Sequence, residues 1–120
     1  MSLRTCYEAF GGDYDGVLGR LRSERLVQKF VLKFLNEGSF SDLMAALETK
    51  DGAAAFRAAH TLKGICLNLS FDKLYVSSNR LCEALRQGWT DEAPGMAKAL
   101  EQDYQITIAA IQALKEELGL

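Results

Sequence analysis

Residues 54–70 of the chain read AAFRAAHTLKGICLNLS, and this stretch decides the fold. At about 100° per residue, the spacing of an α-helix, its small and aliphatic side chains fall on one broad stripe. The stripe comprises Ala55, Ala58, Ala59, Leu62, Ile65, Cys66 and Leu69. A helix with such a stripe buries it against other elements, so the segment predicts a long helix with one face in a core.

The opposite side of the same helix carries His60, Lys63, Gly64 and Leu67, with Phe56 one turn before the histidine. Residues three or four apart meet on a helix surface, so these side chains form one outward patch. His60 is the only histidine in the chain. A glycine inside a helix costs about 1 kcal/mol relative to alanine. Large apolar side chains beside a reactive group are typical of a docking surface.

The chemistry of this patch suits phosphoryl acceptance. An exposed imidazole is neutral and nucleophilic near pH 7. Lys63, one turn on, would supply positive charge to incoming phosphoryl oxygens. Gly64 removes side-chain bulk, which lets another protein's active site close over the ring. Phosphoryl transfer depends mainly on such positioning and charge stabilisation, so the patch predicts a phosphoryl-accepting histidine.

Residues that typically begin or end helices divide the rest of the chain into further helices. Ser23 and Asp51 are expected N-caps, and Ser39 with Asp42 reads as a capping box. Gly88 suits a C-terminal cap, and Pro94 suits the first turn of the last helix. The expected helices are a short N-terminal turn closed by Gly11-Gly12, then residues 13–21, 23–35, one opening at 39, 51–69, 72–87, and a last one ending near 118.

No segment shows the period-two alternation of a strand, so the chain is predicted to be all-α. Short connections between long amphipathic helices favour antiparallel neighbours in a bundle. We expect a single domain over residues 1–120, with flanking helical segments in 1–21 and the bundle over about 23–118.

Composition excludes several classes of function. A chain of 120 residues, 48% of them hydrophobic, can bury a core as one domain without disulfides or metal. The net charge of −2 and the scattered Lys and Arg residues argue against nucleic-acid binding. No stretch approaches the roughly 20 apolar residues of a membrane span, and the first residues do not resemble a secretory signal. We expect no contact with nucleic acid or membrane.

The three cysteines, Cys6, Cys66 and Cys82, are odd in number and widely spaced, which does not fit a disulfide framework. No CxxC pair and no second histidine are present, so we expect no metal site. Free thiols fit a reducing cytosol, so a cytoplasmic location is expected. Cys66 lies on the core stripe and is expected to be buried, whereas Cys82 is a candidate for exposure near His60.

The run Ala59-His60-Thr61-Leu62-Lys63-Gly64, followed by Asn68-Leu69, resembles the signature of histidine-containing phosphotransfer (HPt) domains of two-component phosphorelays. The resemblance extends from about Gly12 into Leu74 and Leu81 and so covers most of the chain. It implies an antiparallel four-helix bundle with short flanking N-terminal helices. It also implies that His60 is phosphorylated, that Lys63 steadies the phosphoryl group and that Gly64 gives access.

The resemblance further implies the partners and the reaction. The chain would accept a phosphoryl group from an aspartate of a response-regulator receiver domain, or of a hybrid histidine kinase, and return it to another. The Mg²⁺ would sit on the receiver domain, so the chain would be a cofactor-free carrier rather than an enzyme. Docking is expected to involve Phe56, Arg57, Thr61 and Leu67, and the protein is expected to be a monomer.

Two positions depart from the family pattern. Many relatives have glycine ten residues after the histidine, where this chain has Ser70, so the corner after the helix would be adjusted. Many also carry Glu or Gln twenty-two residues after it, where this chain has Cys82. That polar residue orients the imidazole, and cysteine is a weak acceptor. Asn79 and Glu83 are nearby candidates for the task, although helical spacing makes neither an obvious substitute.

Two other interpretations remain open. The chain could be a helical adaptor that docks signalling domains without carrying phosphate. It could also be a plain bundle whose outer face has no partner. Burial of Phe56 and Leu67 within the monomer, for example by the N-terminal helices, would favour the plain bundle.

Overall fold

The computed structural model describes residues 1–120 and contains α-helices, one 3₁₀ turn and no strand, which confirms the all-α prediction. The elements are α1 (Leu3–Phe10), α2 (Tyr14–Leu21), α3 (Glu24–Lys33), η1 (Phe34–Asn36), α4 (Ser39–Glu48), α5 (Gly52–Leu69), α6 (Asp72–Ala84) and α7 (Ala93–Glu117). No helix combines the length and the apolar character that crossing a membrane requires.

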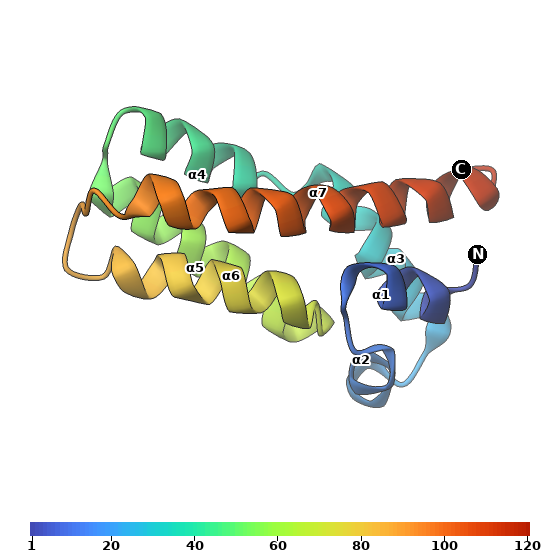
Figure 1. Ribbon diagram of the computed structural model, residues 1–120. Coiled ribbons are helices and arrows are strands. Elements are labelled where there is room, and N and C mark those ends of the chain that lie inside the picture. The colour runs from blue at the N-terminus through green and yellow to red at the C-terminus, as the bar shows by residue number, and fades with distance from the viewer.

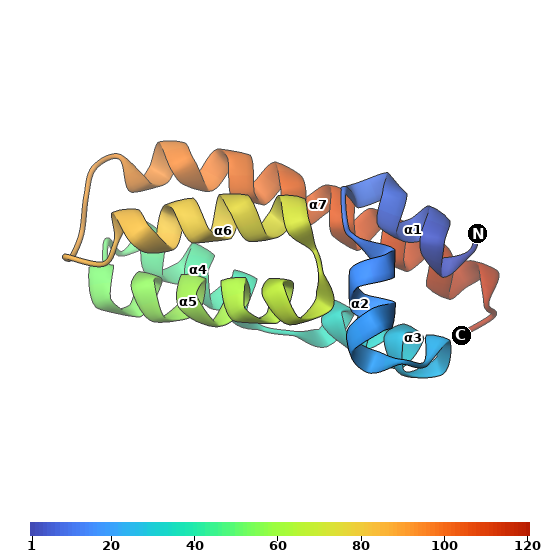
Figure 2. The same cartoon turned by 90° about the horizontal axis from the view of Figure 1, so that it is seen from below.

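Helices α4 to α7 form an antiparallel four-helix bundle, and α1 to α3 gather at one end of it around the C-terminal half of α7 (Figures 1 and 2). Helix α7 packs in both groups, because it continues well past the ends of α5 and α6. The bundle therefore begins at Ser39. Helix α3 belongs to the end group, so the bundle starts later than the predicted residue 23.

Several helix ends lie where their capping residues predict. The Ser23 hydroxyl accepts a hydrogen bond from the Leu26 N–H at 3.2 Å, and the Asp51 carboxylate accepts one from Ala54 at 3.0 Å. Each bond satisfies an amide that the helix itself leaves unpaired. Pro94 lies in the first turn of α7, where its missing N–H costs nothing.

The predicted capping box at Ser39 is wrong. Gly38 precedes α4, and Ser39 lies inside the helix with its N–H and hydroxyl both donating to the Glu37 carboxylate, at 2.8 and 2.9 Å. An ionised carboxylate is a stronger acceptor than a hydroxyl, so Glu37 takes the capping position from outside the helix.

Two helices end earlier than predicted. Helix α3 stops at Lys33 and tightens into η1. Helix α6 stops at Ala84 rather than near Gln87, because the next amides bond three residues back instead of four: Arg86 N–H to Glu83 O, and Gly88 N–H to Leu85 O. Gly88 follows this turn with a φ of +116°, which a side chain would strain.

An aromatic cluster joins the end group to the bundle. Phe71, fully buried in the turn between α5 and α6, meets the rings of Tyr7, Phe10 and Phe34 at centroid distances of 5.6, 4.9 and 5.1 Å. All three pairs are edge-to-face, the arrangement that aromatic quadrupoles favour. The N-terminal helices therefore share one core with the bundle.

The C-terminal end of α5 is tied down by residues of α1, α2 and the turn between them. The Tyr7 hydroxyl donates to the Leu69 carbonyl at 2.8 Å, and the Asp13 N–H donates to the Ser70 carbonyl at 2.8 Å. The Arg20 guanidinium donates to the carbonyls of Leu67 and Asn68, at 3.0 Å each. These bonds satisfy carbonyls that have no partner within the helix.

Ser70 ends α5 in the left-handed conformation, with a φ of +57°. Glycine adopts this conformation without strain, so Ser70 holds a backbone geometry that ordinarily favours glycine. Here the Arg20 guanidinium also donates to the Ser70 hydroxyl. The corner thus keeps the glycine geometry, and the serine gains a partner that glycine would lack.

Replacement of Tyr7 by Phe tests the tie at the end of α5. We expect Tyr7→Phe to lower the free energy of unfolding by about 1–2 kcal/mol, because the Leu69 carbonyl loses its donor in a buried place. Urea denaturation followed by circular dichroism measures the change. Tyr75→Phe is the matched control, since Tyr75 is only partly buried and its hydroxyl makes no hydrogen bond within the chain. Equal destabilisation of the two variants would contradict the assignment.

Candidate functional site

The orientation of α5 follows from its buried stripe. Ala55, Ala58, Ala59, Leu62, Cys66 and Leu69 are all buried as predicted, and α5 packs between α4 and α6. Ile65, at the edge of the stripe, is only partly buried. With this face fixed, His60 is exposed on the outward side of the helix.

The His60 imidazole lies against the ring of Phe56, with ring centroids 5.8 Å apart and planes tilted by 38°. Phe56 is partly buried, because its ring also packs under the guanidinium of Arg86 at 5.2 Å. This is a cation–π contact. The histidine therefore stands beside an aromatic ring that a residue just beyond α6 holds in place.

Lys63 reaches away from the open solvent toward α6. Its ammonium donates to the Asn79 side-chain oxygen at 3.2 Å and lies 3.7 Å from a carboxylate oxygen of Glu83. Only 19% of the side chain is exposed. Asn79 and Glu83, the candidate partners for the imidazole, thus engage Lys63 instead.

Glu83 is itself held by Arg86. Two guanidinium nitrogens of Arg86 donate to the two carboxylate oxygens, at 3.1 and 2.6 Å. These hydrogen bonds, together with the charges of Arg86 and Lys63, hold the pKa of the Glu83 carboxyl below its ordinary value. Glu83 therefore remains ionised at neutral pH and links the two cations beside His60.

Cys82 does not reach the surface. It is 0% exposed, which is contrary to the expectation of exposure near His60. Its side chain lies in the core, and burial raises the pKa of its thiol although the charge of Lys63 opposes this. Burial likewise raises the pKa of Cys66 to about 12. No hydrogen bond joins the imidazole to Cys82, Asn79 or Glu83, and its aromatic neighbour is the Phe56 ring.

On the side of His60 that faces α4, the surface is open. A Cβ atom added to Gly64 would meet nothing within 4 Å, so glycine leaves free space one turn beyond the histidine. Arg57 and Thr61 are exposed on this side and line a shallow groove of about 340 Å³ between α5 and α4. Phe56 and Lys63 thus face α6, whereas Arg57 and Thr61 face α4.

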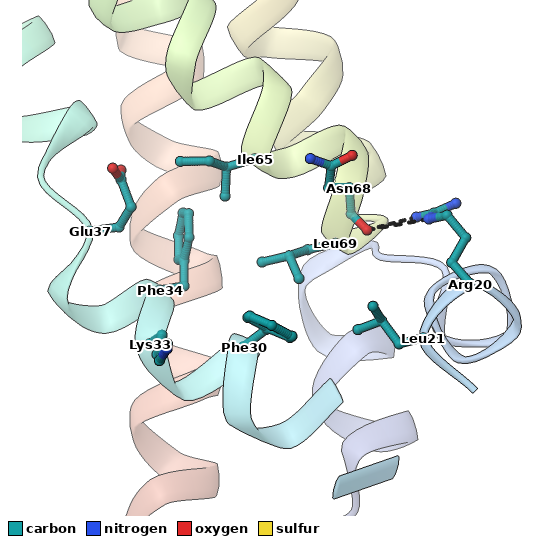
Figure 3. Close-up of a pocket in the computed structure, with 9 residues that line it drawn as sticks. All are labelled: Arg20, Leu21, Phe30, Lys33, Phe34, Glu37, Ile65, Asn68 and Leu69. Carbon is teal, nitrogen blue, oxygen red and sulfur yellow. Dashed lines mark hydrogen bonds between the residues drawn. The ribbon is translucent and has the colours of Figure 1, made fainter. Parts of the chain in front are cut away.

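A second, more apolar groove follows α5 toward its C-terminal end (Figure 3). It has a volume of about 480 Å³ and lies between α5 and the α2–α3–η1 segment. Leu21, Phe30, Phe34, Ile65 and Leu69 line it, and Arg20, Lys33, Glu37 and Asn68 surround them. Leu67, next to this groove in sequence, is 57% exposed. The exposure of Leu67 counts against the plain-bundle interpretation, whereas Phe56 is partly buried within the monomer.

Arg86 is the residue of the site that sequence reasoning missed. Phe56 precedes Lys63 by seven residues, and Arg86 follows Asn79 by seven. Once Lys63 is opposite Asn79 in an antiparallel pair, Phe56 must lie near Arg86. The matching seven-residue spacings were visible in the sequence, but they place Arg86 near Phe56 only once the register of α6 against α5 is known. No group of three or more His, Cys, Asp and Glu side chains is placed to hold a metal ion.

Comparison with known proteins identifies one family. The family model described as Hpt domain matches residues 34–118 of the 120-residue chain, which is η1 through the end of α7. The match includes every residue of the site around His60 and leaves out α1 to α3. No curated protein and no solved structure matches the chain.

Thiol labelling tests the burial of Cys82. We expect all three thiols of the folded protein to react with iodoacetamide at least tenfold more slowly than in denaturant, because burial blocks access and raises their pKa values. The Ala53→Cys variant provides an exposed thiol on α5 as a reference. Peptide mass mapping after short labelling assigns the sites. Modification of Cys82 as fast as the introduced cysteine would show that Cys82 is accessible.

Proposed function

Because this chain belongs to the Hpt domain family, the histidine phosphotransfer proteins of phosphorelays, we propose that it carries a phosphoryl group on His60 between receiver-domain aspartates. The observation that carries the proposal is the placement of His60. It is exposed on helix α5, one turn before Lys63 and before a glycine that leaves open space.

The proposed step is an in-line displacement at phosphorus. The lone pair of an imidazole nitrogen, the outward Nε2, attacks the phosphorus of the aspartyl phosphate. The bond between phosphorus and the aspartate oxygen breaks, and the carboxylate leaves with its electron pair. The ring keeps its proton on Nδ1, so no base on this chain is required. The reverse step delivers the phosphoryl group to the next aspartate.

Two neighbours of His60 assist in this proposal. Lys63 supplies positive charge to the phosphoryl oxygens, which matters because phosphoryl transfer relies on charge stabilisation. Gly64 keeps the space one turn beyond the ring free, so that the acidic site of a receiver domain can reach the imidazole. Phe56, Arg57, Thr61 and Leu67 form the surrounding contact surface for that domain.

In this proposal the chain is a phosphoryl carrier rather than an enzyme, because the receiver domain completes the transfer chemistry. The aspartate and the Mg²⁺ of the transfer are proposed to belong to the receiver domain, free or within a hybrid histidine kinase. As a partner of such domains, the chain is proposed to act in the cytoplasm as a monomer.

Replacement of the acceptor tests the proposal directly. Incubation with a phosphorylated receiver domain should label His60 with an acid-labile, base-stable phosphoryl group, and His60→Ala should abolish the label because the nucleophile is gone. Since His60 is exposed, stability should change by less than about 0.5 kcal/mol. Mass mapping locates the label, and Gln102→Ala, exposed on α7, is the control. A folded protein that accepts nothing from several receivers, or an output that persists in His60→Ala, would favour an adaptor.

Substitutions of Gly64 separate access from stability. Gly64→Ala should stabilise α5 by about 0.5–1 kcal/mol. Gly64→Gln should slow transfer from a receiver at least tenfold, because its side chain fills the space that the partner needs. Labelling by the small donor phosphoramidate should stay unchanged in both variants.

The matched control for Gly64 is Gly95, another helical glycine whose added Cβ meets open space. Gly95→Ala and Gly95→Gln should leave transfer from the receiver unaltered. Rapid transfer to the Gly64→Gln variant would rule out the access role.

A further inference from the structure

Lys63 is occupied in the unphosphorylated protein. Its ammonium has three donors, and two of the available acceptors are oxygens of α6: the Asn79 amide at 3.2 Å and the Glu83 carboxylate at 3.7 Å. These two residues are four apart on α6, so they present their side chains on one face of that helix. Because most of the Lys63 side chain is covered, the ammonium has limited access to other partners.

Glu83 cannot release Lys63 by taking up a proton near neutral pH. Its carboxylate is paired with the Arg86 guanidinium through two hydrogen bonds, at 3.1 and 2.6 Å, and those bonds favour the ionised form. Arg86 is in turn held over the Phe56 ring. The carboxylate therefore stays charged and in place, and 49% of it is exposed to solvent.

A phosphoryl group on His60 would compete for the same ammonium. Such a group brings about two negative charges and three strong acceptor oxygens. His60 and Lys63 are three apart on α5, so the phosphoryl oxygens and the α6 acceptors would lie on either side of the lysine. Binding of the phosphoryl oxygens would compete with the contacts to α6, because both sets of acceptors draw on the same three donors.

We propose that Asn79 and Glu83 are positioning residues that hold Lys63 in the unphosphorylated state and release it when His60 is phosphorylated. This inference rests on the proposed function. The energy lost from the Lys63–Glu83 pair then lowers the stability of the phosphorylated protein. This pair would keep the phosphoryl group on His60 easy to pass on, which suits a relay between two aspartates better than tight storage.

The test measures how strongly His60 retains the phosphoryl group. Phosphoramidate donates to the imidazole: its P–N bond breaks, ammonia leaves and a new N–P bond forms on His60. At fixed concentrations of phosphoramidate and ammonium, ³¹P NMR gives the equilibrium constant for phosphohistidine formation. We expect Glu83→Gln to raise it about two- to fivefold, the range that an exposed ion pair can supply. Asn79→Ala should change it in the same direction by less.

The double variant shows whether the effect passes through Lys63. In a Lys63→Ala background, Glu83→Gln should change the equilibrium constant by much less, because the residue that links Glu83 to the phosphoryl group is absent. The pH titration of the ³¹P shift gives a second readout. Glu83→Gln should lower the pKa of the phosphoryl group in the parent and lower it less when Lys63 is absent. Glu8→Gln, an exposed charge change on α1, is the control and should alter neither readout.

Different measurements would overturn the positioning role and the proposed relay. Equal constants for the parent and Glu83→Gln, or an equal effect of Glu83→Gln with and without Lys63, would overturn the positioning role. The second result would mean that Glu83 acts directly or through Arg86. Absence of transfer from phosphorylated receiver domains would instead overturn the proposed function.

Discussion

The burial of one face of α5 is the constraint on which the site depends. Alanines at 55, 58 and 59 allow the neighbouring helices to approach closely, and Leu62 and Cys66 fill the space between them. A rotation of α5 by one residue, about 100°, would bring polar side chains into the core, at a cost of several kcal/mol. His60 is exposed because no other orientation of this helix buries the stripe.

The outward surface of α5 has two unlike sides. Toward α6, Phe56 and Lys63 are engaged by Asn79, Glu83 and Arg86, so cations and acceptors are paired and ordered. Toward α4, Gly64 leaves free space above a shallow groove. The ion-paired residues lie on the α6 side of the histidine, and the open space lies on the α4 side, where Arg57 is exposed. A partner that approaches from the open side would meet the imidazole without first displacing the ion pairs.

The N-terminal helices contribute to the site from a distance. Tyr7, Asp13 and Arg20 satisfy the last carbonyls of α5, and Phe71 in the following turn packs among aromatic rings from α1 and η1. These contacts fix the corner between α5 and α6, and hence how far along α6 the residues opposite His60 lie. The family match begins at Phe34, so α1 to α3 secure the corner from outside the matched region.

Local sequence was sufficient for the helices, most of their ends and the outward position of His60, because periodicity and caps such as Ser23 and Asp51 act within a few residues. It failed at Ser39, where a carboxylate outside the helix took the cap. Only the tertiary structure decided that Cys82 is buried, that Asn79 and Glu83 bind Lys63, and that Arg86 covers Phe56. Those contacts depend on the register of α6 against α5, which is set by packing between residues distant in the chain rather than by either helix alone.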